Sequence, residues 1–263
     1  MNIYVCIKQV PDSTEVKINP ETGTLIRAGV PSILNPYDHF AVMTAVNIKK
    51  SNPRAVVNVI SMGPPQAKEV IQLALALGAD KGYLLSDMAF AGSDTWATAY
   101  ALSSAIRKIG KFDLIICGMQ AIDGDTAQVG PQIAAQLNIE QITFCDSINI
   151  EGNKIIAKKH IDDGYDIVEA NLPVLVTMVM PKDFELAFPS FVHIKNALSK
   201  EINVYSADNI GVNKELVGLK GSPTQVNRIY PPKREVKTTF INTTSVEAVD
   251  RIVEILKQEN FIK

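Results

Sequence analysis

The sequence has few of the side chains that perform chemistry unaided. Its three cysteines, Cys6, Cys117 and Cys145, each stand alone in an apolar stretch. Structural zinc sites and disulfide frameworks need paired or regularly spaced cysteines, so we expect buried free thiols in a reducing compartment. The three histidines are equally scattered. We expect them at surface or helix-capping positions, and we predict no metal site.

The chain also lacks an excess of charge and a long apolar run. Its 26 basic and 28 acidic residues leave a formal net charge of −2, which argues against a nucleic-acid partner. No apolar stretch approaches the roughly 20 residues of a membrane-spanning helix, so we expect no membrane insertion. The first residues enter a strand-like pattern directly, without the regions of a signal peptide. These features predict a cytoplasmic protein.

Sequence patterns of common catalytic sites are missing as well. The hydrolase pattern G-x-S-x-G, the P-loop pattern G-x-x-x-x-G-K-[ST] and the dinucleotide pattern G-x-G-x-x-G do not occur. The carboxylates form no spaced acid–base pair. We therefore predict no catalytic residue, and any chemistry would belong to a bound cofactor.

What the sequence does contain is a regular alternation of short apolar strands with amphipathic helices. Strand-like runs near residues 3–7, 55–60, 82–85 and 113–117 are separated by helical patterns. This alternation predicts an α/β fold with a doubly wound parallel sheet. Ligands of such sheets bind beyond the carboxyl ends of the strands, at the switch point. The tails of the first, second and fourth strands, with the Asn35 turn, should therefore close one crevice.

A polar loop with two glycines, Gly118 and Gly124, follows the fourth strand. The next helix should begin between residues 126 and 130, because Pro131 is tolerated only in its first turn. Glycines before a helix N-terminus are suited to bind an anion.

Within this loop, we place the phosphates of a ligand on the glycine amides and on the Thr126 hydroxyl. Asp123 and Asp125 would repel phosphate and are assigned to ribose hydroxyls or backbone N–H groups. The alternative is a plain strand-to-helix connection in which the Asp and Thr side chains only cap the helix.

Outside this region the pattern is less regular. Residues 15–24 have the turn chemistry of a small hairpin, and four runs between residues 142 and 180 predict antiparallel hairpins added to the sheet. Residues 181–189 form a loop whose three large apolar side chains have nothing local to bury them.

The C-terminal part has no sustained period until a final helix, which carries a Thr244–Glu247 capping box and an apolar stripe. That stripe must pack on the core or, as we favour, on another subunit. We predict a nucleotide-binding domain at residues 1–205 and a C-terminal arm with a helix at residues 206–263.

Several segments resemble the beta subunit of electron transfer flavoprotein. They are VCIKQVPD at residues 5–12, NPYD at 35–38, MGPP at 62–65, QAIDGDTAQVGP at 120–131 and GSPT at 221–224. The fourth segment is highly specific, and the similarity runs nearly from end to end. The resemblance implies a heterodimer with an alpha subunit that carries its own FAD, and an adenine nucleotide in the predicted crevice.

Two branches of this family differ in that nucleotide. In simple electron carriers it is AMP. In electron-bifurcating members a second FAD takes a hydride from NADH and sends one electron towards ferredoxin or flavodoxin and the other towards the alpha-subunit FAD. The segment 120–131 is similar to the bifurcating version, and a small Gly124 would leave room for a diphosphate. We therefore hypothesise that the chain binds FAD.

The resemblance also assigns residues. Tyr37 is similar to the aromatic position that approaches the alpha-subunit flavin. Residues 181–195 correspond to the loop that recognises the client dehydrogenase, with Phe184 or Leu186 as anchor. The residues expected at the cofactor are Cys6, Lys8, Asn35, Tyr37, Asp38, Met62, Gly118, Met119, Gln120, Ala121, Asp123, Gly124, Asp125, Thr126, Ala127, Gln128 and Val129.

Two departures from the family pattern keep alternatives open. Met119 stands where bifurcating members commonly have arginine, and the recognition loop lacks the Pro-Arg-Tyr pattern of subunits that serve acyl-CoA dehydrogenases. The client is accordingly an acyl-CoA dehydrogenase or a 2-hydroxyacid dehydrogenase. A non-bifurcating carrier that binds AMP, and a nucleotide-sensing regulatory protein without redox function, remain as alternatives.

Overall fold

The computed structural model describes residues 1–12, 31–227, 238 and 240–262. The chain divides into two compact units, Met1–Asn227 and Arg228–Lys263, which are considered separately. The small hairpin predicted at residues 15–24 lies outside the described residues. Among the helices that are described, none combines the length and the apolar character needed to cross a bilayer.

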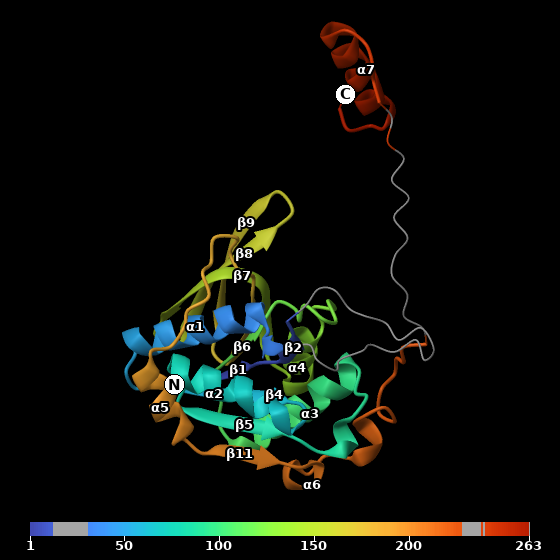
Figure 1. The fold of residues 1–263 in the computed structure, drawn as a ribbon. Helices are drawn as coiled ribbons and strands as arrows, with labels where there is room; N and C mark the ends of the chain where they lie inside the picture. Colours follow the sequence, from blue (N-terminus) through green and yellow to red (C-terminus); the bar gives the residue numbers. More distant parts are fainter. Residues whose placement is uncertain (13–30, 228–237, 239, 263) are drawn as a thin grey trace. The chain divides into compact units, whose positions relative to one another are not determined.

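A nine-stranded sheet runs through the first unit (Figure 1). Its strand order is β11-β5-β4-β1-β6-β10-β7-β8-β9. The pairs from β11 to β7 are parallel, and β7–β8 and β8–β9 are antiparallel. The predicted α/β fold with a doubly wound parallel sheet is confirmed. The strands are β1 (Asn2–Cys6), β4 (Val56–Met62), β5 (Lys81–Leu85), β6 (Leu114–Gly118), β7 (Glu140–Glu151), β8 (Lys154–Ile161), β9 (Gly164–Asn171), β10 (Val174–Met178) and β11 (Ile202–Tyr205).

Helices cover both faces of the sheet because the central strands are apolar on both sides. In β1, Ile3 and Val5 face one core cluster while Tyr4 and Cys6 face the other. Helices α1 (Pro36–Ser51), α2 (Lys68–Leu77) and α5 (Phe191–Leu198) contribute to the first cluster. Helices α3 (Thr95–Ile109), α4 (Val129–Leu137) and α6 (Ala207–Ile210) contribute to the second.

The order of the central strands creates a switch point beside β1. The chain passes from β1 to β4 and β5 on one side, and then returns to β6 on the other side of β1. Single turns of 3₁₀ helix, η1 (Pro65–Ala67) and η2 (Met88–Phe90), follow β4 and β5. The carboxyl ends of β1, β4 and β6 therefore converge, as the sequence predicts.

One strand departs from the expected hairpins. β10 does not extend the antiparallel part but lies between β6 and β7, parallel to both. Its residues Val174, Leu175 and Val176 are fully buried, because side chains on both faces of a central strand meet a helical layer. The prediction of antiparallel hairpins holds for β7, β8 and β9 only.

The first part of the predicted arm also belongs to the main core. Ala207, Ile210, Val212 and Val217 are buried in the cluster that α3 and α4 cover. The segment contains α6 and a 3₁₀ turn, η3 (Lys214–Leu216), elements too short to show a period in the sequence. The second unit contains α7 (Ser245–Gln258), which begins with the predicted Thr244–Glu247 capping box.

Candidate functional site

A pocket of about 910 Å³ opens beyond the carboxyl ends of β1, β4 and β5. It is lined from the β1 end by Lys8 and Gln9, from the β4 end by Met62 and the Gly63–Ala67 turn, and from the β5 end by Ser86–Met88 and Phe90–Ser93. Two short strands, β2 (Gln9–Pro11) and β3 (Ser32–Leu34), stand beside its mouth as a separate antiparallel sheet. This is the position at which open α/β sheets bind their ligands.

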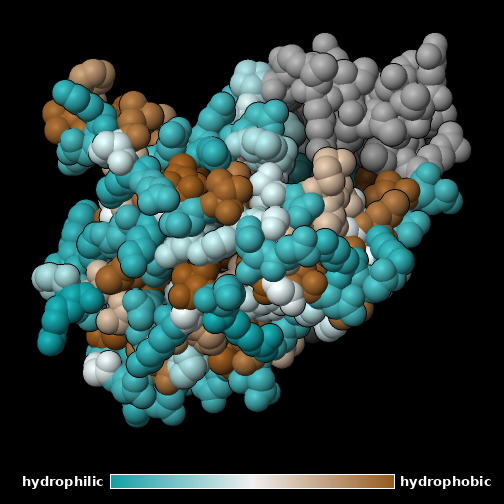
Figure 2. Space-filling view, turned by 90° about the horizontal axis from the view of Figure 1, so that it is seen from below, coloured by the Kyte–Doolittle hydropathy of each residue, from teal (hydrophilic) through white to brown (hydrophobic). Residues whose placement is uncertain are grey.

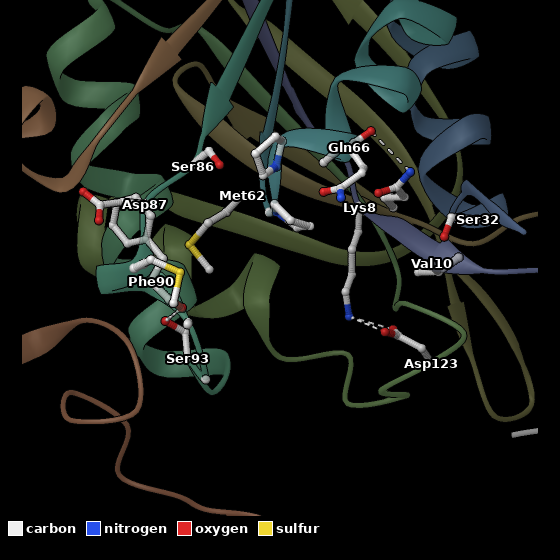
Figure 3. A pocket seen from close by; sticks show the side chains of 18 of the residues that line it. Lys8, Val10, Ser32, Met62, Gln66, Ser86, Asp87, Phe90, Ser93 and Asp123 are labelled. Atoms are coloured by element: carbon white, nitrogen blue, oxygen red, sulfur yellow. Dashed lines mark hydrogen bonds and ion pairs between the residues drawn. The ribbon is translucent and has the colours of Figure 1, made fainter. Parts of the chain in front are cut away.

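The two sides of the pocket differ in character. Figure 3 shows Lys8 and Asp123 facing one another on one side, with Asp87, Phe90 and Ser93 on the other and Met62 reaching in from β4. The Lys8 ammonium lies 2.6 and 2.9 Å from the two carboxylate oxygens of Asp123. An ion pair therefore stands at one side, and a thioether and an aromatic ring stand at the other.

Asp38, in the first turn of α1, joins the ends of two neighbouring strands. Its carboxylate accepts hydrogen bonds from the backbone N–H of Lys8 at 2.8 Å and of Gly118 at 3.1 Å. The side chain is buried, and burial raises the pKa of Asp38 from 3.8 to about 7, against the lowering effect of these hydrogen bonds and of Lys8. Asp38 thus holds the ends of β1 and β6 together where the loop after β6 begins.

Asn35 holds the next part of the loop. Its side-chain amide donates to the Gln120 carbonyl at 2.8 Å and accepts from the Ile122 N–H at 3.2 Å. Asn35 occupies the N-cap position of α1, as predicted, but its side chain makes no capping bond to the helix. Both Asn35 and Asp38 were expected to contact the nucleotide, whereas their polar atoms bond to the protein backbone.

The loop after β6 has an unusual backbone. Asp125 and Ala127 adopt positive φ angles of 54° and 52°, the left-handed region that non-glycine residues rarely enter. The backbone conformation at residue 124, in contrast, does not require glycine, and a Cβ added to Gly124 would meet nothing within 4 Å. Strain of this kind collects at functional sites. An open Gly124 leaves space above the loop.

The amides of this loop are used differently from the sequence-based expectation. The Gly118 N–H is engaged by Asp38, and the Gly124 N–H donates to the Ala121 carbonyl at 3.3 Å within a turn. Neither glycine amide is thus directed to a phosphate in this arrangement. Lys8, which lines the pocket and pairs with Asp123, and Thr126, which is exposed on the loop, are donors suited to an anion.

The plain capping alternative for this loop is wrong. Helix α4 begins at Val129 with Gln128 as N-cap, within the predicted range, and no side chain caps it there. The Gln128 side chain instead accepts from the Thr95 hydroxyl at 3.0 Å. Asp125 bonds to the Gln120 side chain. The polar residues of the loop therefore do not have helix capping as their role.

Of the predicted cofactor residues, Lys8, Met62 and Asp123 line the pocket directly. Tyr37 is half-buried in the first turn of α1, and the Met119 N–H donates to the Met178 carbonyl, which continues the ladder to β10. Cys6 ends β1, and Asn35 and Asp38 lie at the start of α1, whereas the other residues of the set lie between Gly118 at the end of β6 and Val129 at the start of α4. The structure brings the whole set to one end of the sheet.

Cys6 and Cys117 lie deeper, at the ends of their strands. They are direct neighbours in the β1–β6 ladder, and both face the α3–α4 side. The pKa of the Cys117 thiol is raised well above 9.0 by its hydrogen bond with Cys6 and by burial. All three cysteines are buried free thiols, as expected.

The part of the pocket lining that follows β5, within residues 86–93, was missed by the sequence reasoning. It contributes Ser86, Asp87, Met88, Phe90 and Ser93 to the lining. These residues follow β5, so the same carboxyl-end rule that selected the tails of the other strands could have selected them.

The segment 181–189 is partly held against α1. The Phe184 ring lies 4.9 Å from the Phe40 ring and 6.3 Å from the His39 ring, both edge-on. Phe184 is therefore half-buried, and the helix that covers it is distant from it in the sequence rather than local. His39 is buried rather than at the surface, and burial lowers its pKa.

Farther along this segment the apolar side chains are exposed. Leu186 is 39% exposed and Phe188 is 85% exposed, and Phe191 at the start of α5 is also exposed. Figure 2 shows the molecule from below the view of Figure 1, and on this face hydrophilic surface predominates while hydrophobic residues form separate small patches. An exposed aromatic residue such as Phe188 was not singled out from the sequence, although its side chain is the most accessible of the three in the loop.

Comparison of the chain with known proteins identifies a matching family. The electron transfer flavoprotein domain family matches residues 22–209. The chain is 49% identical to the electron transfer flavoprotein subunit beta of Thermoanaerobacterium thermosaccharolyticum and 47% identical to the caffeyl-CoA reductase-Etf complex subunit CarD of Acetobacterium woodii. It is 39% identical to the acryloyl-CoA reductase electron transfer subunit gamma of Anaerotignum propionicum. Each of the three alignments spans 100% of both chains.

Proposed function

The chain belongs to the electron transfer flavoprotein family, and we propose that it acts as the beta subunit of a heterodimeric electron carrier. The alpha subunit of this carrier would hold one FAD, and the pocket at the carboxyl ends of β1, β4 and β5 would hold a second FAD. The observation that carries the proposal is the position of that pocket, at the switch point beside the 118–129 loop.

The residues of the pocket suit an adenine dinucleotide. Its volume of about 910 Å³ lies in the upper part of the roughly 300–1,000 Å³ range of cofactor and ligand sites. The Lys8 ammonium can bind phosphate, and the open surface at Gly124 leaves the loop accessible. Met62 and Phe90 offer apolar contact to a planar ring. A monophosphate would use only part of this lining.

The redox chemistry would come from the cofactor. When bound, a flavin in this pocket would accept a hydride from NADH and supply single electrons to two acceptors, the alpha-subunit FAD and ferredoxin or flavodoxin. The chain's own part is to bind and orient the cofactor: Lys8 holds negative charge, while Asp38 and Asn35 keep the loop in place. The buried thiols and strand ends below the loop keep water from that side of the site.

The proposed partners follow from the exposed surfaces and from the relatives. The segment 181–195 would contact the client flavin dehydrogenase through Leu186 and Phe188. Two of the relatives carry the names of CoA-ester reductase systems, which favours an acyl-CoA dehydrogenase type of client over a 2-hydroxyacid dehydrogenase. In the second unit, α7 has an exposed apolar stripe that includes Val246, Val249 and Ile252, which the alpha subunit would cover.

The test is to extract flavin and nucleotide from the co-expressed heterodimer and to measure their stoichiometry. Two flavins per heterodimer, bleached by NADH, are expected. One flavin with one AMP would overturn the FAD assignment in favour of the non-bifurcating carrier. A colourless protein that binds AMP or ATP as a homodimer would favour the regulatory alternative, against which the family membership already argues.

A further inference from the structure

The GSPT motif of the arm lies behind one wall of the pocket. We call residues Met88–Ser93 the pocket wall, because they line the pocket between β5 and α3. We call Gly218–Thr224 the arm segment; the described residues that line the pocket do not include it. The arm segment is separated from the pocket wall by more than 120 positions in the chain, yet the two are joined by a dense set of hydrogen bonds.

Two of these bonds come from the backbone of the arm segment. The Gly218 N–H donates to the Ser93 hydroxyl at 2.9 Å, and the Leu219 N–H donates to the Ala91 carbonyl at 2.9 Å. The Ser93 hydroxyl donates in turn to the Phe90 carbonyl at 2.8 Å. The backbone of the arm segment thus bonds to the pocket wall at Ala91 and at Ser93.

Ser222 adds a side-chain connection. Its hydroxyl oxygen accepts from the Asp94 N–H at 2.8 Å, and the hydroxyl lies 2.8 Å from the Gly218 carbonyl and 3.3 Å from the Gly92 carbonyl. Ser222 is one of the few buried polar residues in the described part of the chain. A buried hydroxyl with this many partners is costly to replace, because each backbone group would lose a partner away from water.

Thr224 completes the connection by binding to Asp94, the N-cap residue of α3. One carboxylate oxygen of Asp94 accepts from the Thr224 N–H at 2.9 Å and from the Thr224 hydroxyl at 2.7 Å. The other oxygen caps α3 by accepting from the Ala97 N–H at 3.0 Å. One carboxylate therefore both starts α3 and holds the arm segment.

The fit between the two segments leaves no room for added side chains. Gly218 has a φ of +64°, and a Cβ there would collide with the Ala89 carbonyl oxygen. Gly92 has a φ of +74°, and its Cβ would lie 3.1 Å from the Leu219 Cβ. These glycines allow the two backbones to approach closely.

We propose that Ser222 and Thr224 are positioning residues of the nucleotide pocket, which hold the pocket wall in place by binding the arm segment to Asp94. This proposal rests on the nucleotide-binding function proposed above. The pocket wall is an irregular connection, and such connections open locally unless tertiary contacts restrain them. The hydrogen bonds from the arm segment restrain the pocket wall. The shape of the pocket therefore depends on residues that do not line it.

The test uses the full-length chain co-expressed with its partner subunit and freed of nucleotide. Thr224→Val removes the hydroxyl but keeps the shape, and Thr224→Ser keeps the hydroxyl. Titration with AMP and with ADP should show a Kd raised by up to about tenfold in Thr224→Val, because the lost hydrogen bond to a charged group weakens the restraint on the pocket wall. Thr224→Ser should bind as the wild type does. Thr44→Val, which removes a hydroxyl bonded to the Phe40 carbonyl elsewhere in the fold, is the matched control.

A second measurement does not depend on nucleotide. Hydrogen exchange of the ligand-free protein should be faster in Thr224→Val and Ser222→Ala within residues 86–94, and unchanged in α1 and α2. Unchanged exchange in the pocket wall, or faster exchange with an unchanged Kd, would overturn the positioning role while leaving the proposed function intact. A wild-type protein that binds neither AMP nor ADP would overturn both proposals.

Discussion

The carboxylate of Asp38 accepts a hydrogen bond from the Gly118 N–H at 3.1 Å, and it occupies the space that any side chain at residue 118 would need. A Cβ at this position would collide with that carboxylate and would lie 2.8 Å from the Asp38 backbone nitrogen. The glycine at the end of β6 is therefore required by the packing of α1, independently of any ligand.

Gly118→Ala is expected to destabilise the fold by about 1 to 3 kcal/mol, the usual cost of forcing extra volume into a packed site. The free energy of unfolding in urea measures this effect. Gly110→Ser is not a suitable control, because Gly110 has a φ of +143°. Gly124→Ala is suitable, since it adds the same methyl group to the same loop region where nothing lies within 4 Å. Equal stability of Gly118→Ala and Gly124→Ala would contradict this account.

Gly124→Ala is expected to act on the cofactor instead. Because the added methyl group has open space around it, stability should stay within about 0.5 kcal/mol of the wild type. If the space above Gly124 serves a diphosphate, the variant should retain less flavin after purification with its partner subunit. The flavin-to-protein ratio from the absorption spectrum measures this, and full flavin content would show that Gly124 does not face the cofactor.

Asp38 should make stability depend on pH. Burial raises its pKa from 3.8 to about 7, so the folded protein binds this proton more tightly than the unfolded chain does. The stabilisation is complete below about pH 4 and is lost as the pH rises through about 7. Asp38→Asn cannot titrate, so its stability relative to the wild type should improve from pH 5 to pH 8.

The matched control for this experiment is Asp113→Asn. Asp113 accepts from the Asn2 N–H at 2.7 Å, at the opposite ends of the same two strands. Asp113→Asn is measured over the same pH range, so that the effect of replacing a carboxylate that bonds to a strand-end N–H is known separately. A pH-independent difference between Asp38→Asn and the wild type would show that burial does not control the ionisation of Asp38.

Lys8→Gln should weaken nucleotide binding through loss of charge. Lys8 stands at the pocket and pairs with Asp123, and an incoming phosphate would compete for the same ammonium. We expect the Kd for AMP to rise by roughly tenfold, and its dependence on salt to become weaker. Isothermal titration at two salt concentrations measures both. Lys50→Gln, at the far end of α1, is the control. An unchanged Kd in Lys8→Gln would remove Lys8 from the site.

Leu186→Ala and Phe188→Ala should weaken electron delivery to the client dehydrogenase without loss of flavin. Both side chains are exposed in the loop that follows β10. The rate of client reduction by the complex, measured against client concentration, should show a higher apparent KM. The sequence predicts the same loss of electron delivery for Phe184→Ala. Because the Phe184 ring packs on Phe40, this variant should also be less stable than the wild type. Flavin loss in Leu186→Ala or Phe188→Ala would contradict a role in recognition.

Regular elements were accessible from the sequence because each rests on a local signal. Asn35 and Pro36 mark the start of α1, Asp94 and Gly110 mark the limits of α3, and Pro131 limits where α4 can begin. The convergence of the strand tails followed from a general rule of parallel sheets. The position of β10 did not, because its apolar run fits a central strand of either direction, and only the completed sheet chooses its neighbours.

The roles of individual polar residues were the least predictable part. Asn35 and Asp38 were correctly placed near the loop, but their polar atoms bond to its backbone, which no spacing in the sequence reveals. The link between Thr224 and Asp94 joins residues 130 positions apart. Such a contact has no periodic signature.

By itself, the sequence determined the alternation of strands and helices, the polar loop at 118–129 and the similarity to a flavoprotein family, since these depend on residue order within short windows. Tertiary structure alone decided which carboxylate is buried, which glycine is crowded by its neighbours and which distant segment supports the pocket wall. The physical reason is that burial and hydrogen-bond partners are properties of the assembled fold, in which residues far apart in the chain come to share one small volume.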